Sequence, residues 1–274
     1  DELPDEFIEK VRAAVKRVSP EKFLLGEVWE DATTKFGFNK RRTYLLGKGL
    51  DSVMNYPFKN AVLDFVKGKP AEQAMTEILT ICEHYPAPAM DTALNFLSTH
   101  DTERALTVIA DEPANGRGRA WQSGRCVTGD AYEEGLLRLR MAYAIIYTLP
   151  GVPCLYYGDE IAMQGYRDPF NRAFFRWDAH EQRLRPVLAQ LAQLRHTCEA
   201  FRTGQLRVLR AEGGILHYQR VGKVETAEII VNRTEHIIVE TLASGKSTEV
   251  NPMGFTIVVE EVGHNPNHSY YDYV

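Results

Sequence analysis

Two kinds of apolar pattern alternate over the first 200 residues of the chain. Apolar residues at helical spacing, with charged residues between them, predict amphipathic helices. These lie at residues 4–18, 58–66, 70–85, 131–149 and 180–198. Short apolar runs between the helices are typical of buried parallel strands, and they lie at residues 23–28, 50–55, 93–98 and 151–158. The alternation predicts consecutive βα units with right-handed crossovers.

Four strands are half of an eight-stranded (β/α) barrel, which needs about 250 residues in full. This part of the chain uses only the first 200 of its 274 residues. The pattern therefore leaves two architectures open. One is a small open sheet, and the other is the second half of a (β/α)8 TIM barrel, containing its strands 5 to 8.

The sequence pattern changes after Phe201, where short β-rich runs are separated by Gly, Asn and Pro. These runs cover residues 206–211, 214–221, 227–231, 237–241 and 255–261, and they predict an antiparallel C-terminal β-sandwich. The expected domains are therefore 1–200 for the barrel part and 201–263 for the sandwich. Residues 264–274 have no periodicity, so we expect a tail that packs loosely or is disordered.

Composition excludes several classes of protein. With 44% hydrophobic and 25% charged residues and a net charge of −5, the chain resembles an ordinary soluble globular protein. No basic patch indicates nucleic acid or an anionic membrane as a partner. The uncharged run at 141–158 is cut by Pro150, Gly151 and Pro153, so we do not expect it to cross a membrane. Four widely spaced cysteines favour reduced thiols and a cytoplasmic location.

Carboxylates lie at the carboxyl ends of two of the predicted strands. Glu27 lies at the end of the run at 23–28, and Asp101 follows the strand at 93–98 within a stretch of the same design, 93–104. Glu27 alone could mark only the point where the chain reaches water, but two such stretches favour a functional role. In barrels and open α/β sheets the carboxyl ends of strands carry the chemistry, and paired carboxylates suit glycosidic bond cleavage.

The neighbours of these acids leave two interpretations open. Trp29 lies two residues after Glu27 and would offer a sugar ring a flat aromatic surface, or else pack beneath the following loop. His100 could hydrogen-bond a sugar hydroxyl or cap the strand end. No metal-ligand spacing is present.

Three motifs, in this order along the chain, resemble successive signature regions of the α-amylase superfamily of retaining glycoside hydrolases. They are the segments 25–29 (LGEVW), 96–102 (FLSTHDT) and 150–161 (PGVPCLYYGDEI). Two further segments, 51–57 (DSVMNYP) and 168–172 (DPFNR) with Trp177 behind it, are most similar to the neopullulanase, cyclomaltodextrinase and maltogenic amylase group.

The resemblance implies a role for each matching residue. Glu27 matches the general acid/base and Asp101 the stabiliser of the transition state, while His100 matches a residue that binds sugar hydroxyls. Trp29 falls near the acceptor subsite, and Asn55 is a further candidate for substrate binding.

Asp168 and Arg172 fall where this group contacts sugars on the non-reducing side. An ion pair between them that braces the loop is the structural alternative.

The family's nucleophile is an Asp in an Arg-x-Asp segment at the end of the fourth barrel strand. Asp1-Glu2 resembles the residues that directly follow it, so we expect the nucleophile to be missing from this chain. The resemblance then implies the C-terminal part of an α-glucan hydrolase that cleaves α-1,4 links in maltodextrins or cyclodextrins. Alone, this part would be nearly inactive, and its open strand edges would cause self-association.

Two other functions stay open: a non-catalytic carbohydrate-binding or structural relative, and a glucan transferase of the same superfamily. No cofactor is expected. Calcium occurs in the superfamily, but no loop here has a ligand spacing that supports a site.

Overall fold

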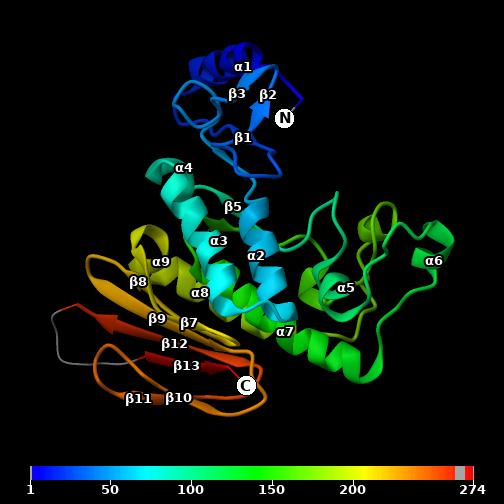
Figure 1. The fold of residues 1–274 in the computed structure, drawn as a ribbon, viewed down its shortest axis with the longest axis vertical. Helices are drawn as coiled ribbons and strands as arrows, with labels where there is room; N and C mark the ends of the chain where they lie inside the picture. The colour runs from blue at the N-terminus through cyan, green and yellow to red at the C-terminus, as the bar shows by residue number, and fades with distance from the viewer. Residues whose placement is uncertain (1, 263–268, 274) are drawn as a thin grey trace.

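The computed structural model describes residues 2–262 and 269–273. Helix α1 and the strands β1 to β3 form one end of the molecule, helices fill the middle, and an antiparallel sheet forms the other end (Figure 1). The helices are α1 (Asp5–Val18), α2 (Tyr56–Lys67), α3 (Ala71–His84), α4 (Ala87–Asp91), α5 (Ala105–Ala110), α6 (Arg119–Ser123), α7 (Gly129–Thr148), α8 (Leu184–Thr197) and α9 (Glu199–Thr203). Two 3-10 turns, η1 (Asp159–Ile161) and η2 (Phe170–Arg172), follow α7.

Four short parallel strands lie at the predicted positions. They are β1 (Leu25–Gly26), β4 (Ser52–Val53), β5 (Leu94–Asn95) and β6 (Val152–Pro153). β1 pairs with β4, β5 pairs with β6, and a parallel bridge from Met54 to Leu94 joins the two pairs. The strands therefore lie side by side in chain order. Each is shorter than its apolar run, because the following residues turn away into the loops that carry the polar side chains.

Buried asparagines connect three of these strands. The Asn55 side chain is fully buried, accepts from the Phe58 backbone amide at 3.3 Å, and so caps α2. Its Nδ2 donates to Asn95 Oδ1 at 2.9 Å, and Asn95 Nδ2 donates to the Pro150 carbonyl at 2.7 Å. Gly151, at φ +104°, permits this close approach, since a Cβ there would lie 2.7 Å from the Ala93 carbonyl oxygen.

The segment between residues 29 and 49 contains a short hairpin. Its strands are β2 (Phe36–Gly37) and β3 (Lys40–Arg41), which pair antiparallel across Phe38 and Asn39. Both turn residues have positive φ values, of 54° and 60°. Asparagine tolerates this conformation better than most residues.

The C-terminal part is a five-stranded antiparallel sheet in the order β13-β12-β9-β8-β7. Its strands are β7 (Gln205–Glu212), β8 (Ile215–Val221), β9 (Glu225–Asn232), β12 (Gly254–Glu261) and β13 (Ser269–Tyr273). A hairpin of β10 (Ile238–Thr241) and β11 (Ser247–Val250) packs on it through a small apolar cluster that includes Ile230, Leu242 and Val258.

In this region one strand was missed, and one prediction is wrong. β11 was not predicted, because its Ser-Thr-Glu-Val sequence contains a single apolar residue. The prediction that the tail has no regular structure is wrong for Ser269–Tyr273, which pairs with β12. The prediction for the other tail residues, 264–268 and 274, lies outside the described residues.

One continuous apolar core runs from helices α2, α3 and α7 into strands β8, β9 and β12. Arg220 of β8 is buried at this junction, where its guanidinium donates to the Thr148 carbonyl at 2.7 Å and to the Gly204 carbonyl at 2.8 and 3.1 Å. Thr148 Oγ1 also lies 2.5 Å from the Tyr218 hydroxyl. Within residues 2–262 and 269–273, none of the helices has the length and apolar character needed to span a membrane.

We expect Arg220→Met to lower the free energy of unfolding by about 3 kcal/mol, because two buried carbonyls lose a charged donor. Arg207→Met on the neighbouring strand is the control, since Arg207 is exposed, and it should change stability by less than about 0.5 kcal/mol. Urea denaturation of both variants measures the difference. Equal stabilities would contradict a role for Arg220 at the junction.

Candidate active site

Three titratable side chains meet where β1 and β5 end. Glu27 directly follows β1, and His100 and Asp101 lie in the turn that follows β5. One ligand-type atom of each side chain lies within 4.8 Å of those of the other two. His100 Nε2 lies 3.2 Å from Asp101 Oδ2, and both side chains are partly open to solvent. The structure thus brings together the acids that the sequence placed at the ends of separate strands.

Two aromatic side chains hold the Glu27 carboxylate. The Tyr56 hydroxyl donates to Glu27 Oε1 at 2.7 Å, and Trp29 Nε1 donates to the same oxygen at 3.2 Å. The rings of Trp29 and Tyr56 are stacked, with centroids 4.6 Å apart and planes 13° from parallel. Trp29 is 44% exposed and Tyr56 only 2%, so the indole is available to a ligand and the phenol supports it from below.

Asp101 is held from the other side by a guanidinium. Arg172 of η2 donates to Asp101 Oδ1 at 2.9 Å and to the His100 carbonyl at 2.8 Å. Asp168 Oδ1 lies 3.3 Å from Arg172 Nε. Arg172 therefore bridges both carboxylates, so the predicted Asp168 and Arg172 do form an ion pair beside Asp101. In so exposed a place this pair adds little stability.

The turn that carries His100 and Asp101 is supported by one buried amide. Asn171 is fully buried, and its Nδ2 donates to the carbonyls of Thr99, His100 and Thr102 at 3.3, 2.7 and 2.8 Å. Asn171 thus fixes the position of the turn, while the adjacent Arg172 contacts the carboxylate on it.

A buried ion pair lies beneath this layer. Arg104 is fully buried, and its Nη1 lies 3.1 Å from Asp159 Oδ1. The same guanidinium donates to the Asn171 carbonyl at 3.0 Å and to the Tyr157 carbonyl. The Tyr143 hydroxyl donates to Asp159 Oδ2 at 2.6 Å. Burial raises the pKa of Asp159, although Arg104 favours the ionised carboxylate.

Asn55 does not belong to this cluster. As described above, its amide caps α2 and bonds Asn95 beneath the site. The neighbouring Tyr56 contacts Glu27 instead.

Glu27, His100 and Asp101 are donor types that metals use, and they are close together. However, two hydrogen-bond donors already occupy one Glu27 oxygen, and the Arg172 cation lies against Asp101. A neighbouring guanidinium disfavours a bound cation, so we assign no metal to the cluster.

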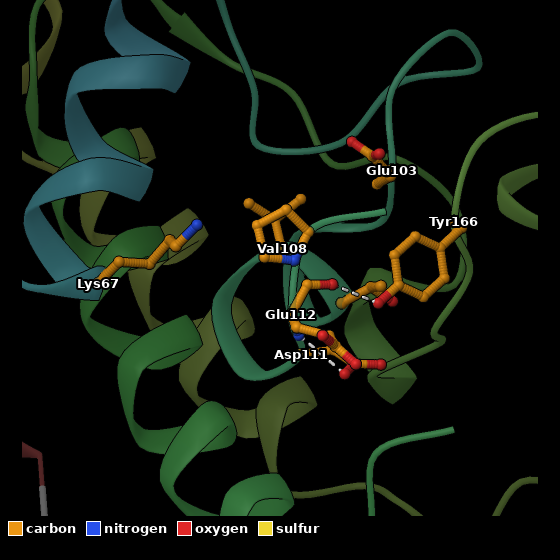
Figure 2. Close-up of a pocket in the computed structure, with 8 residues that line it drawn as sticks. Lys67, Glu103, Val108, Asp111, Glu112 and Tyr166 are labelled. Carbon is orange, nitrogen blue, oxygen red and sulfur yellow. Dashed lines mark hydrogen bonds between the residues drawn. The ribbon is translucent and has the colours of Figure 1, made fainter. Parts of the chain in front are cut away.

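The hollows beside the cluster differ in character. A groove of about 250 Å³ runs along β1, and Glu27 lies among mostly apolar lining residues that include Leu3, Ile8 and Leu25. A second cavity, of about 70 Å³, lies between α2 and the segment after α5 (Figure 2). There Tyr166 donates to the Glu112 carbonyl at 2.6 Å, while Lys67 points in from α2. Ligand pockets usually measure about 300 Å³ or more, so this cavity is too small for a sugar ring.

The family model described as the alpha amylase catalytic domain matches residues 3–205. The chain belongs to the alpha-amylase family. This confirms the resemblance drawn from the three ordered motifs.

Two curated relatives carry names from the group suggested by the sequence or close to it. A cyclomaltodextrinase of Geobacillus thermopakistaniensis is 31% identical over 240 residues, which are 85% of this chain and 35% of that protein. An amylopullulanase of Thermoanaerobacter thermohydrosulfuricus is 31% identical over 236 residues, covering 80% of this chain and 15% of the relative. This alpha-amylase family chain thus spans about a third or less of the length of these relatives.

A solved structure gives the same fold. The ligand-free cyclic alpha-maltosyl-(1→6)-maltose hydrolase from Arthrobacter globiformis superposes with a TM-score of 0.79 at 24% identity. The superposition covers 95% of this chain and 54% of that one. At this identity the likeness supports the alpha-amylase fold alone.

Sequence reasoning did not single out Tyr56, Asn171 or Arg104. Tyr56 and Asn171 lie inside quoted motifs, but neither an aromatic residue at a helix start nor a lone amide reveals its distant partner. Arg104 ends the stretch at 93–104, and no pattern there shows that the structure buries it completely.

We expect Asn171→Leu to lower the free energy of unfolding by about 3 kcal/mol, because the carbonyls it serves lose their donor in a buried place. Asn60→Leu, at an exposed position of α2, is the matched control and should change stability by less than about 0.5 kcal/mol. Chemical denaturation measures both. Asn171→Leu behaving like Asn60→Leu would show that the turn does not depend on this amide.

Proposed function

We propose that this chain is the acid-bearing part of an α-glucan hydrolase that cleaves α-1,4-glucosidic bonds in maltodextrins, cyclodextrins or related oligosaccharides. The observation that carries the proposal is the meeting of Glu27, His100 and Asp101 beside an exposed indole at the ends of parallel strands. The curated relatives named above supply the substrate class by their names.

In this mechanism Glu27 protonates the glycosidic oxygen as the bond to the anomeric carbon breaks, and later removes a proton from the water that completes hydrolysis. Asp101 and His100 bind ring hydroxyls and favour the distorted, positively charged sugar. Trp29 supports the apolar face of a ring on the acceptor side. Arg172 with Asp168 would contact the sugars on the other side of the cleaved bond.

A retaining reaction also needs a carboxylate that attacks the anomeric carbon, about 5 to 5.5 Å from the acid. We propose that this nucleophile lies outside the 274 residues, at the end of a strand that pairs along β1. The strands β1, β4, β5 and β6 would then be strands 5 to 8 of the barrel, and β7 to β13 its C-terminal β-sandwich. The apolar groove along β1 and the exposed Phe23 and Leu25 support this arrangement.

A glucan transferase would use the same residues with a sugar acceptor in place of water. The exposed face of Trp29 suits either acceptor. Product analysis with added glucose separates the two reactions, because only a transferase forms longer or branched products.

We expect the protein expressed with its upstream residues to release reducing sugar from maltotriose and β-cyclodextrin. Glu27→Gln should lower that rate at least about 1,000-fold, because the leaving oxygen is no longer protonated. Glu21→Gln, an exposed glutamate before the same strand, is the control and should retain full activity. Undiminished hydrolysis by Glu27→Gln would refute the assigned acid.

The 274-residue chain alone should release little sugar under the same conditions. Strong activity that Glu27→Gln abolishes would mean that a nucleophile is supplied within the chain or by a second copy.

We also propose that the 274-residue chain self-associates through the edge of β1. Leu25→Lys should shift the population toward monomer, because a charge on an edge strand opposes pairing with another strand. Val18→Lys, which places the same charge at an exposed position at the end of α1, should leave the association unchanged. Multi-angle light scattering gives the masses, and a monomeric parent chain would contradict the proposal.

A further inference from the structure

Tyr56 makes a short contact with the candidate acid. Its hydroxyl donates to Glu27 Oε1 at 2.7 Å, which is the shorter of the two hydrogen bonds described for that oxygen. A phenol that donates to a carboxylate forms a charge-assisted bond, stronger than one between neutral groups. This bond weakens when the carboxylate takes up a proton.

A capped helix start and two aromatic rings hold the Tyr56 phenol in position. Tyr56 is the first residue of α2, next to Asn55, whose side chain caps the helix. Its ring lies between the Trp29 ring and the edge of Phe96, with centroid distances of 4.6 and 4.8 Å. The hydroxyl therefore has little freedom to leave Glu27, and the Trp29 ring rests on a surface that is itself held in place.

The surroundings keep Tyr56 in its donor form. Burial, and next the hydrogen bond to Glu27, raise the pKa of the Tyr56 phenol well above its ordinary value. It therefore stays protonated over the whole range in which a carboxyl group titrates. The other polar groups around Glu27 include the indole of Trp29, His100 and Asp101, with Arg172 behind Asp101. The Thr99 side chain also interacts with the Tyr56 hydroxyl.

We propose that Tyr56 is a positioning residue for the acid, whose hydrogen bond fixes the orientation of the Glu27 carboxylate and is strongest while that group is ionised. It also supports Trp29 as the sugar platform, so one side chain couples the acid to the binding surface. This inference rests on the proposed role of Glu27. It adds that a buried phenol at the start of α2, after the neighbouring strand β4, holds the acid in place.

The test uses Tyr56→Phe, which removes one oxygen atom and keeps the ring stack. Trp29 lies against Glu27, so its fluorescence should report protonation of that carboxylate, and the pH titration needs no enzymatic activity. We expect the midpoint to rise by about one pH unit in Tyr56→Phe, because the ionised carboxylate loses a donor. The same transition should be absent in Glu27→Gln, which identifies it among the signals of the three tryptophans.

Tyr132→Phe is the matched control, because it removes a phenol oxygen from a carboxylate outside the cluster, that of Glu181. It should leave the midpoint unchanged. An unchanged or lowered midpoint in Tyr56→Phe would overturn the inference, whereas full hydrolysis by Glu27→Gln would overturn the proposed function instead.

In the active, longer protein, the alkaline limb of the pH–rate profile should move upward with the fluorescence midpoint in Tyr56→Phe. Loss of rate at every pH with no movement of the limb would indicate only a structural role and would also overturn the inference.

Discussion

The buried ion pair between Arg104 and Asp159 lies beneath the turn that carries His100 and Asp101, and Asn171 connects the pair to that turn. Arg104 has no exposed surface, and it contacts two later segments of the chain, through the Tyr157 carbonyl and Asp159 carboxylate and through the Asn171 carbonyl. The rings of Tyr156 and Tyr157 also lie against its guanidinium. Removing one partner from such a pair leaves an uncompensated buried charge, which costs about 3 to 5 kcal/mol.

The site is built in two layers above that pair. In the lower layer, buried groups with no solvent access hold backbone: Asn171 holds the turn at 99–102, and Asn55 and Asn95 hold the strand ends. In the upper layer, partly exposed groups face solvent: Trp29, His100, Asp101 and Arg172. Tyr56 belongs to both layers, because its ring is buried while its hydroxyl contacts Glu27. The arrangement gives reactive side chains fixed positions without excluding a substrate.

The sequence predicted the parts of this site that depend on local pattern. Apolar runs ending in Glu27 and Asp101 mark strand ends, and strand ends of a parallel sheet lie along one edge. The sequence could not predict which of two adjacent residues in a motif has its side chain at the site and which has it in the interior. Asn55 and Tyr56 are adjacent, yet the first lies below the sheet edge as a helix cap and the second contacts the acid. Likewise, β11 and β13 form by pairing with other strands. Segments of four and five residues are too short for a hydrophobic periodicity to identify them.

The most direct test is a crystal structure of the longer protein proposed above, bound to acarbose, which carries a nitrogen in place of a glycosidic oxygen. We expect this nitrogen to lie within about 3 Å of the Glu27 carboxylate. We also expect ring hydroxyls on Asp101 and His100, and a sugar ring against Trp29. Acarbose bound away from the Glu27–His100–Asp101 cluster, or with Glu27 turned from its glycosidic nitrogen, would contradict these expectations.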